Sequence, residues 1–177
     1  MRLTETNIAG VYIIDIERIS DDRGFFARSF DVATLAENGL HTDYPQCNIS
    51  FNAKRGTLRG MHYQADPHGE VKIVRCTTGS LYDVALDMRP ESVTYKQWVG
   101  VELSAENRRM LYLPTGIAHG FQTLEDATEV FYMMGTVYHP QSARGVRWND
   151  TAFSIKWCDI EPRIMSDKDR TYEDFTA

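Results

Sequence analysis

The residues of this sequence best suited to proton transfer are two histidines that lie close to glycines in strand-like segments. His62 follows Arg59 and Gly60, and His119 ends the Pro-x-Gly-x-x-His run at 114–119. A neutral imidazole is an effective general base near neutral pH. Alternation along a strand would place Arg59 and His62 on opposite faces, whereas a bulge at Gly60 would bring them to the same side. We therefore predict a bulge at Gly60. Taken alone, His62 would more commonly be a core or surface histidine.

The same two histidines occupy positions that metal-binding cupins use for ligands, but the rest of that ligand set is missing. The position of the second histidine is Gln64, no glutamate follows until Glu70, and Thr123 stands where Asn or His is expected after His119. Two imidazoles without a carboxylate make a poor site for a divalent ion. The sequence therefore predicts no metal ion and no other cofactor.

A histidine base needs a carboxylate that orients one of its ring nitrogens, and two aspartates are candidates. Asp83 lies in an otherwise apolar strand-like run, where an aspartate is more often functional or paired. Asp169 lies in a charged segment that would by itself be a solvated tail. Lys72 alternates with apolar neighbours, so it points either into a pocket or into solvent. Tyr132 and Tyr138 share strand parity and face either one cavity or an aromatic core.

The elements that carry these residues are short β-rich runs separated by turn residues. Turns at 77–80 and 104–107 predict two hairpins. A helix is predicted over 32–38, with Asp31 as its N-cap and Gly39 at its C-terminal end. Many short strands with one small helix favour an all-β sandwich or barrel. The predicted strands cover 11–16, 46–52, 71–76, 81–88, 97–103, 109–113 and 129–138.

Length and composition are consistent with one domain over residues 1–177. A formal net charge of −6 argues against non-specific binding to nucleic acid or to an anionic membrane. The three cysteines, an odd number, indicate no disulfide framework. The N-terminus lacks the apolar core of a signal peptide, and no apolar run is as long as a membrane span. We therefore expect a cytoplasmic protein.

Several motifs in their order and spacing resemble the dTDP-4-dehydrorhamnose 3,5-epimerase family over nearly the whole chain. The resemblance implies a metal-free cupin jelly roll that forms a homodimer. It also implies inversion of C3 and C5 of a 4-keto-6-deoxyglucose attached to dTDP, which gives dTDP-4-dehydro-L-rhamnose. The motifs that carry the resemblance are Asp22-Arg23-Gly24-Phe25-Phe26, Gln46-Cys47-Asn48-Ile49-Ser50, the glycine-rich run 56–64, Lys72-Ile73-Val74-Arg75-Cys76, Asp83-Val84-Ala85-Leu86-Asp87-Met88-Arg89, the 114–121 run, Tyr138-His139-Pro140, Trp148-Asn149-Asp150 and Ser166-Asp167-Lys168-Asp169.

By this resemblance the catalytic residues divide the work of enolate chemistry. A proton beside a ketone is acidic because the resulting carbanion delocalises onto oxygen, so a base, a cation at that oxygen and an acid on the opposite face are needed. His62 would be the base and Asp169 its orienting partner. Lys72 would stabilise the enolate at the C4 oxygen, and Tyr138 would be the acid.

The resemblance also implies a set of substrate-binding residues. A planar guanidinium is well suited to bidentate contacts with a diphosphate. The implied residues are Arg23 and Arg59 on the diphosphate with Lys168 or Arg170 assisting, Phe26 against the nucleotide base, Gln46 and Asn48 as hydrogen-bonding groups, Tyr132 in the sugar pocket, and Asp83 and His119 in the polar lining.

One position departs from the family pattern, and several alternative functions remain to be considered. Arg28 stands where family members usually carry a glutamate, which leaves the specificity for the nucleotide base open. The alternatives are inversion of C3 or C5 only, a 3,4-ketoisomerase, an epimerase of a sugar on another nucleotide, and a non-catalytic sugar-nucleotide-binding cupin. The combination of His62, Asp169 and Tyr138 favours an epimerase over a ketoisomerase. The presence of Lys72 together with Tyr138 argues against a non-catalytic protein.

Overall fold

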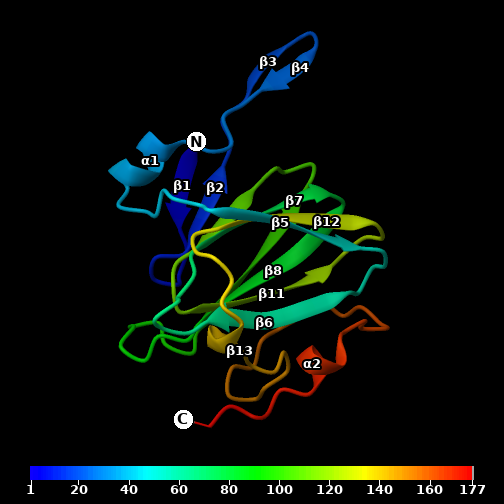
Figure 1. The fold of residues 1–177 in the computed structure, drawn as a ribbon. Coiled ribbons are helices and arrows are strands. Elements are labelled where there is room, and N and C mark those ends of the chain that lie inside the picture. The colour runs from blue at the N-terminus through cyan, green and yellow to red at the C-terminus, as the bar shows by residue number, and fades with distance from the viewer. Residues whose placement is uncertain (177) are drawn as a thin grey trace.

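The computed structural model describes residues 1–176, and its body is formed by two antiparallel β-sheets that pack face to face (Figure 1). This architecture confirms the all-β prediction. The six-stranded sheet has the order β1 (Arg2–Glu5), β2 (Tyr12–Asp15), β10 (Met110–Leu113), β7 (Lys72–Thr78), β12 (Thr128–Met134) and β5 (Gln46–Asn52). The five-stranded sheet has the order β13 (Ala143–Gly145), β6 (Leu58–Gln64), β11 (Ile117–Thr123), β8 (Ser80–Asp87) and β9 (Trp98–Ser104).

The two predicted hairpins are wrong, although both turns are where the sequence placed them. The turn at 77–80 leads from β7 to β8, and the turn at 104–107 leads from β9 to β10. In both cases the two strands belong to different sheets. Turn residues decide where the chain reverses, but burial of both sheet faces decides which strands pair. The connections from β5 onward pass from one sheet to the other except between β8 and β9, which is the jelly-roll arrangement.

The predicted helix is confirmed as α1 (Val32–Glu37). The Asp31 side chain accepts a hydrogen bond from Ala33 N, and Gly39 takes a φ of +68° after the last turn, a conformation that favours glycine. The other helices are a 3₁₀ turn (Pro140–Ser142) and α2 (Asp167–Arg170). Within residues 1–176, no helix has the length and apolar character needed to cross a membrane.

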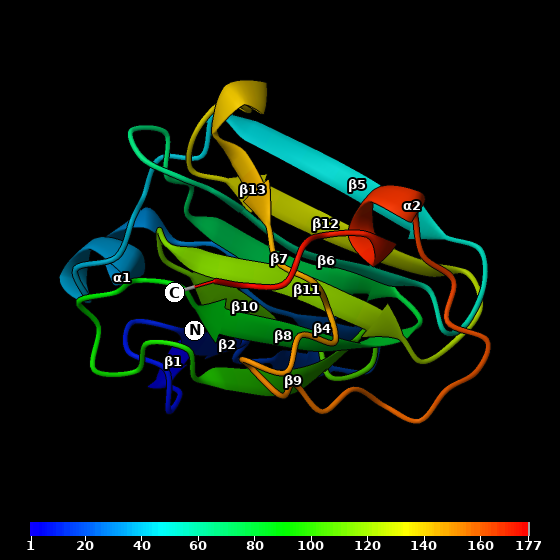
Figure 2. The ribbon, with the colours of Figure 1, turned by 90° about the horizontal axis from the view of Figure 1, so that it is seen from below.

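The C-terminal segment covers the outer face of the five-stranded sheet (Figure 2). The main core lies between the sheets and includes Val74, Leu111 and Phe121. A second cluster packs the outer face of the five-stranded sheet against Phe153 and Ile155. Figure 2 shows the C-terminal segment and α2 crossing in front of this sheet. The segment predicted to be a solvated tail is therefore a packed layer that carries α2 to β6.

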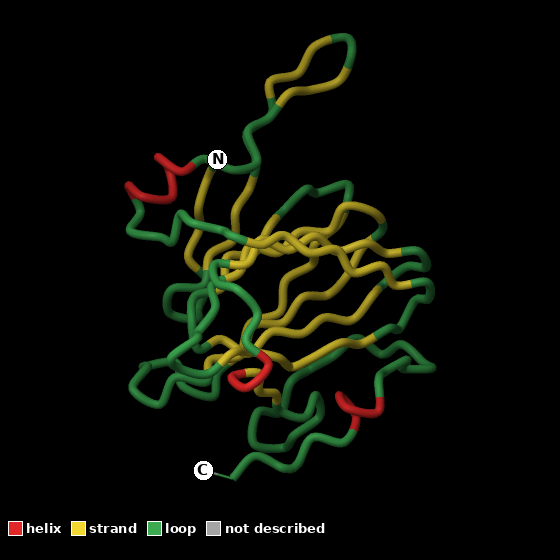
Figure 3. Tube along the Cα trace, in the orientation of Figure 1, coloured by secondary structure: helices red, strands yellow, loops and turns green. Residues whose placement is uncertain are grey.

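A short hairpin of β3 (Ile19–Asp21) and β4 (Gly24–Phe26) projects from the body of the molecule (Figure 3). Both strands are exposed along their whole length. On β4, the ring of Phe25 is contacted by the guanidinium groups of Arg18 and Arg108, which are 4.7 and 5.0 Å from its centroid. Such cation–π contacts orient the hairpin on the loop that follows β9.

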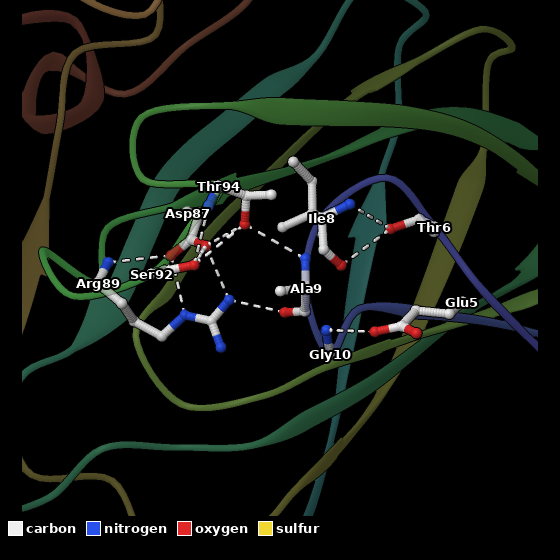
Figure 4. Close-up of polar contacts among 9 residues, drawn as sticks. All are labelled: Glu5, Thr6, Ile8, Ala9, Gly10, Asp87, Arg89, Ser92 and Thr94. Atoms are coloured by element: carbon white, nitrogen blue, oxygen red, sulfur yellow. Dashed lines mark hydrogen bonds and ion pairs between the residues drawn. The ribbon is translucent and has the colours of Figure 1, made fainter.

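A buried aspartate ties the loop between β8 and β9 to the turn that precedes β2 (Figure 4). Asp87 accepts hydrogen bonds from Arg89 Nε at 2.9 Å, from Ser92 Oγ at 2.6 Å and from Thr94 Oγ1 at 2.6 Å. Arg89 Nη2 in turn donates to Ala9 O at 2.7 Å. Burial alone would raise the pKa of Asp87, but these hydrogen bonds outweigh it and lower the pKa to about 2.

Candidate active site

A cavity of about 570 Å³ opens between the two sheets and is lined by half of the predicted site residues. Strands from both sheets and helix α2 contribute to its lining, so it depends on the complete fold. The predicted residues in the lining are Asn48 on β5, Arg59 and His62 on β6, Lys72 on β7, His119 on β11, Tyr132 on β12 and Asp169 on α2.

A bulge in β6 brings Arg59 and His62 to the same cavity, as predicted. His62 pairs with His119, and Arg59 pairs with Phe121, so β6 carries one residue more than β11 between these two pairs. Gly60 lies in this bulge with a φ of +122°. A Cβ on Gly60 would lie 2.5 Å from the Cα of Gly120, so only glycine fits where the two backbones approach.

His62 forms a close pair with Asp169. The distance from His62 Nε2 to Asp169 Oδ1 is 2.6 Å, and Asp169 Oδ2 accepts a hydrogen bond from Gly60 N at 3.3 Å. Burial would raise the pKa of Asp169, but the hydrogen bond and charge of His62, with the Gly60 amide, hold it below its ordinary value of 3.8. The ionised carboxylate fixes the proton of the ring on Nε2. Nδ1 of His62 is therefore the nitrogen available to take a proton.

The second aspartate of the sequence analysis, Asp83, pairs with the other histidine. His119 Nε2 lies 2.5 Å from Asp83 Oδ1, and both residues are buried. The ring of Tyr132 packs edge-on against His119 at a centroid distance of 6.2 Å. Burial, followed by the nearby charge of Asp83, raises the pKa of the Tyr132 phenol, so this phenol stays neutral in the site.

Lys72 enters the cavity with a carboxylate partner that sequence reasoning missed. Lys72 Nζ lies 2.8 Å from Glu70 Oε1, and both side chains are buried. The signal for this pair was present, because residues two apart in an extended chain point to the same side. The sequence analysis considered Glu70 only as a metal ligand.

Tyr138 lies beside the main cavity. It borders a smaller cavity of about 160 Å³ together with His62, Glu70 and Lys168. His62 lines both cavities, so the imidazole stands between the space reached by Lys72 and the space reached by Tyr138. The side chain of Tyr138 has access to solvent, since the residue is 57% exposed.

Comparison with known proteins identifies the family of this chain. The sequence profile of the dTDP-4-dehydrorhamnose 3,5-epimerase family matches residues 5–177. The chain belongs to this family. It is 41% identical over 170 residues to the dTDP-4-dehydrorhamnose 3,5-epimerase of Shigella flexneri, an alignment that covers 96% of this chain and 93% of the relative.

Solved structures of epimerases have the same fold. The Bacillus anthracis dTDP-4-dehydrorhamnose 3,5-epimerase, with TDP and PPi bound, superposes with a TM-score of 0.93 at 39% identity, covering 98% of this chain and 99% of that one. The Legionella pneumophila dTDP-6-deoxy-D-glucose-3,5-epimerase, in complex with dTDP-4-keto-L-rhamnose, gives a TM-score of 0.88 at 37% identity, covering 95% and 89%. The expected family and its cupin-type jelly roll are confirmed.

In this epimerase, five of the residues assigned to substrate binding line neither cavity, and one of them, Asp83, reaches the main cavity only through its contact with His119. Arg23 and Phe26 lie on the projecting hairpin, where the Arg23 side chain is 90% exposed and Phe26 is 71% exposed. Gln46 accepts a hydrogen bond from Tyr138 N at 2.8 Å through its side-chain oxygen. Arg170 lies exposed on α2. Within one copy of the epimerase, the cavity therefore lacks the two hairpin residues.

The donor atoms of the site are arranged for proton transfer. Among residues 1–176, His, Cys, Asp and Glu side chains form no group of three or more that could hold a metal ion. Each imidazole in the main cavity instead has one carboxylate on Nε2.

Proposed function

We propose that this epimerase converts dTDP-4-dehydro-6-deoxy-D-glucose to dTDP-4-dehydro-L-rhamnose by inverting C3 and C5. The observation that carries the proposal is the His62–Asp169 pair, placed in one cavity with the Lys72 ammonium. A base and a cation in one enclosed space are what enolate formation from a ketosugar requires. Family membership supplies the substrate class.

Deprotonation begins at Nδ1 of His62. This nitrogen takes the proton from the carbon next to the ketone, and the electron pair left on carbon forms the enolate with its charge on the C4 oxygen. Asp169 stabilises the imidazolium that results through the Nε2 hydrogen bond of 2.6 Å. The Lys72 ammonium stabilises the oxygen, where a preformed positive charge in a water-poor cavity is most effective.

Inversion requires the proton to return from the other side of the sugar ring. Tyr138 is the group that we assign to this role, because its phenol is a proton donor and it lines the smaller cavity together with His62. Its exposure lets the phenolate regain a proton from solvent. A base, a cation and an acid complete the reaction, so the proposed chemistry uses no cofactor.

Arg59 is placed to bind the diphosphate of the nucleotide. Its Nε donates to Asn52 Oδ1 at 2.7 Å and its Nη2 to Phe51 O at 3.5 Å, which holds the guanidinium where it lines the cavity. Asn48 on β5 and Tyr132 on β12 border the same space. Arg28 pairs with the helix cap Asp31 at 2.8 Å, so in one copy of the chain its charge is directed to α1.

We further propose that the active form is a homodimer in which each copy completes the cavity of the other. Strand β5 is an edge strand beside the cavity, and it exposes Ile49 and Phe51 to 65% and 58%. Exposed apolar side chains on an edge strand favour association. The projecting β3–β4 hairpin of a second copy, with Phe26 exposed, offers both the apolar surface and the Arg23 guanidinium that the cavity lacks.

Proton NMR of the chelator-treated protein with dTDP-4-keto-6-deoxyglucose in deuterated water tests the proposed reaction. We expect deuterium at both C3 and C5, because each inversion passes through an enolate that is reprotonated from solvent. The His62→Ala variant should lose this exchange and still bind dTDP. Deuterium at one carbon only would contradict double inversion. Absence of exchange in the wild type with the nucleotide bound would contradict the substrate.

A further inference from the structure

A continuous set of polar contacts, buried at its Lys72 end, connects Lys72 with the backbone next to Tyr138. Glu70 holds Lys72 Nζ through Oε1 at 2.8 Å, and its Oε2 accepts a hydrogen bond from Gln64 Nε2 at 3.1 Å. Gln64 Oε1 then accepts a hydrogen bond from His139 N at 2.6 Å. Gln64 is only 2% exposed, so water does not compete for these contacts. The proposed cation and the proposed acid thus share one polar framework.

Both the nitrogen and the oxygen of the Gln64 side-chain amide form hydrogen bonds in this framework. Its amide nitrogen also donates to His68 O at 3.3 Å, in addition to the contact with Glu70. The ring of His68 stacks on the ring of His139 at a centroid distance of 3.6 Å and an interplanar angle of 11°. The residue after Tyr138 is therefore held through both its backbone and its side chain.

The 138–139 backbone is tied to both sheets at once. Gln64 ends β6 of the five-stranded sheet and holds His139 N. Gln46 begins β5 of the six-stranded sheet, and its side-chain oxygen accepts from Tyr138 N at 2.8 Å. Two consecutive amides bound to side chains from opposite sheets fix the entry of the Tyr138 side chain into the smaller cavity.

We propose that Glu70 and Gln64 are positioning residues that set two different steps of the reaction. This inference rests on the proposed epimerase function. Glu70 fixes the Lys72 ammonium toward the C4 oxygen and so governs enolate formation. Gln64 fixes the backbone that carries Tyr138 and so governs the return of the proton. Neither residue lines the main cavity, and each acts through the group that it holds.

The physical basis is the geometric tolerance of proton transfer. Misplacement of a reacting group by about 1 Å can lower a rate by about 100-fold. Removing an acceptor from a buried N–H leaves that group without a partner, and the segment then moves to find another one. Loss of Gln64 should therefore displace Tyr138, whereas loss of the Glu70 carboxylate should release Lys72.

Two near-isosteric variants separate these roles. Gln64→Met keeps the volume of the side chain and removes its three hydrogen bonds, and we expect turnover to fall by about 10-fold or more while deuterium exchange at carbon is largely retained.

Glu70→Gln removes the charge that holds Lys72, and we expect exchange and turnover to fall together by about 10-fold. The KM for the substrate should change little in both. Gln141→Met, at an exposed position of the same segment, is the matched control and should behave as the wild type.

A double-mutant cycle with Tyr138→Phe decides whether Gln64 acts through Tyr138. In the Tyr138→Phe background, Gln64→Met should cause little further loss of turnover, because the group that it positions is already absent. Multiplicative losses in the double variant would overturn the proposal, as would equal loss of exchange and turnover in Gln64→Met. If Gln64→Met fails to fold, Glu70→Gln remains a test, and wild-type exchange in that variant would refute the role of Glu70. A wild-type protein without exchange would instead refute the proposed function itself.

Discussion

Each imidazole in the main cavity is paired with one buried carboxylate. His62 is bound to Asp169 and His119 to Asp83, at 2.6 and 2.5 Å. The two pairs differ in access, because His62 is partly exposed whereas His119 is buried. A base must meet substrate and exchange protons with solvent, so the exposed pair is suited to proton abstraction and the buried pair to a fixed polar wall.

The Asp169→Asn variant tests the contribution of the carboxylate to the base. The amide keeps the shape of the side chain but removes the charge that selects the His62 tautomer. We expect kcat to fall by about 100- to 10,000-fold, as in other carboxylate–histidine pairs, with little change in KM. Steady-state kinetics with the same nucleotide sugar provide the measurement. Asp167→Asn, at an exposed position of α2, is the control, and an equal effect in both variants would show that only the helix was disturbed.

At the scale of elements, the loops of the sandwich are held by side chains that end the strands. Asp87 closes β8 and binds three residues of the following loop, two of which, Arg89 and Thr94, also contact Ala9 (Figure 4). Because the folded-state pKa is about 2 and the ordinary value is 3.8, the carboxylate stabilises the fold above pH 3.8 and loses this contribution as the pH falls through about 2.

Asp87→Asn should therefore destabilise the protein by about 2 kcal/mol near neutral pH, from a pKa difference of nearly two units. Guanidinium unfolding curves at a series of pH values provide the measurement. The difference between the wild type and the variant should narrow as the pH is lowered from about 4 toward about 2. Asp159→Asn, at an exposed position, should leave the curves unchanged. A difference that stays constant with pH would show that the loss arises from packing alone.

Sequence predicted the elements that alternation and capping specify. The strand at 46–52 and the helix capped by Asp31 agree with the structure, and the bulge at Gly60 is where the glycine indicated it. Strands β1, β3 and β4 were missed because nearly all of their side chains are exposed, so no alternation marks them. Helix α2 was missed because its four residues are charged, and its burial against β6 is a property of the whole fold.

The sequence indicated single side chains of the site more readily than the contacts between them. His62 and Arg59 stood out by type and by glycine spacing, whereas only the family resemblance directed Lys72 to the site. Sequence left the partner of His62 open between Asp83 and Asp169, because the choice depends on α2 reaching β6. The contact of Gln46 with the Tyr138 backbone joins residues 92 positions apart, and no local pattern marks such a contact.

For the whole molecule, the homodimer that we propose, in which each copy's hairpin completes the other's cavity, predicts that two inactive variants restore each other. One variant carries His62→Ala with an intact hairpin, and the other carries Arg23→Ala and Phe26→Ala with an intact base. A mixed dimer would contain one complete site, made of the second variant's base and the first variant's hairpin. Random mixing should therefore recover about one quarter of wild-type activity.

The measurement is turnover after the two variants are unfolded and refolded together at equal concentration. Each variant refolded by itself is the control and should remain nearly inactive. Wild-type activity of the hairpin variant alone would show that Arg23 and Phe26 serve no site. If the mixed variants form a dimer but recover no turnover, the hairpin does not complete the cavity of the other copy.

The crossing of the chain between the two sheets also has a consequence for biosynthesis. Ile14 of β2 pairs with Met110 of β10, and Asn52 of β5 pairs with Thr128 of β12, so each early strand is translated long before its partner. Pairing of such distant strands closes long loops, and the entropy of loop closure is lost before the contacts form. Folding is therefore slow. Asp169 is translated after every strand of both sheets. A ribosome-bound chain therefore carries His62 without its carboxylate, and the base becomes competent only when the last segment docks on a finished sandwich.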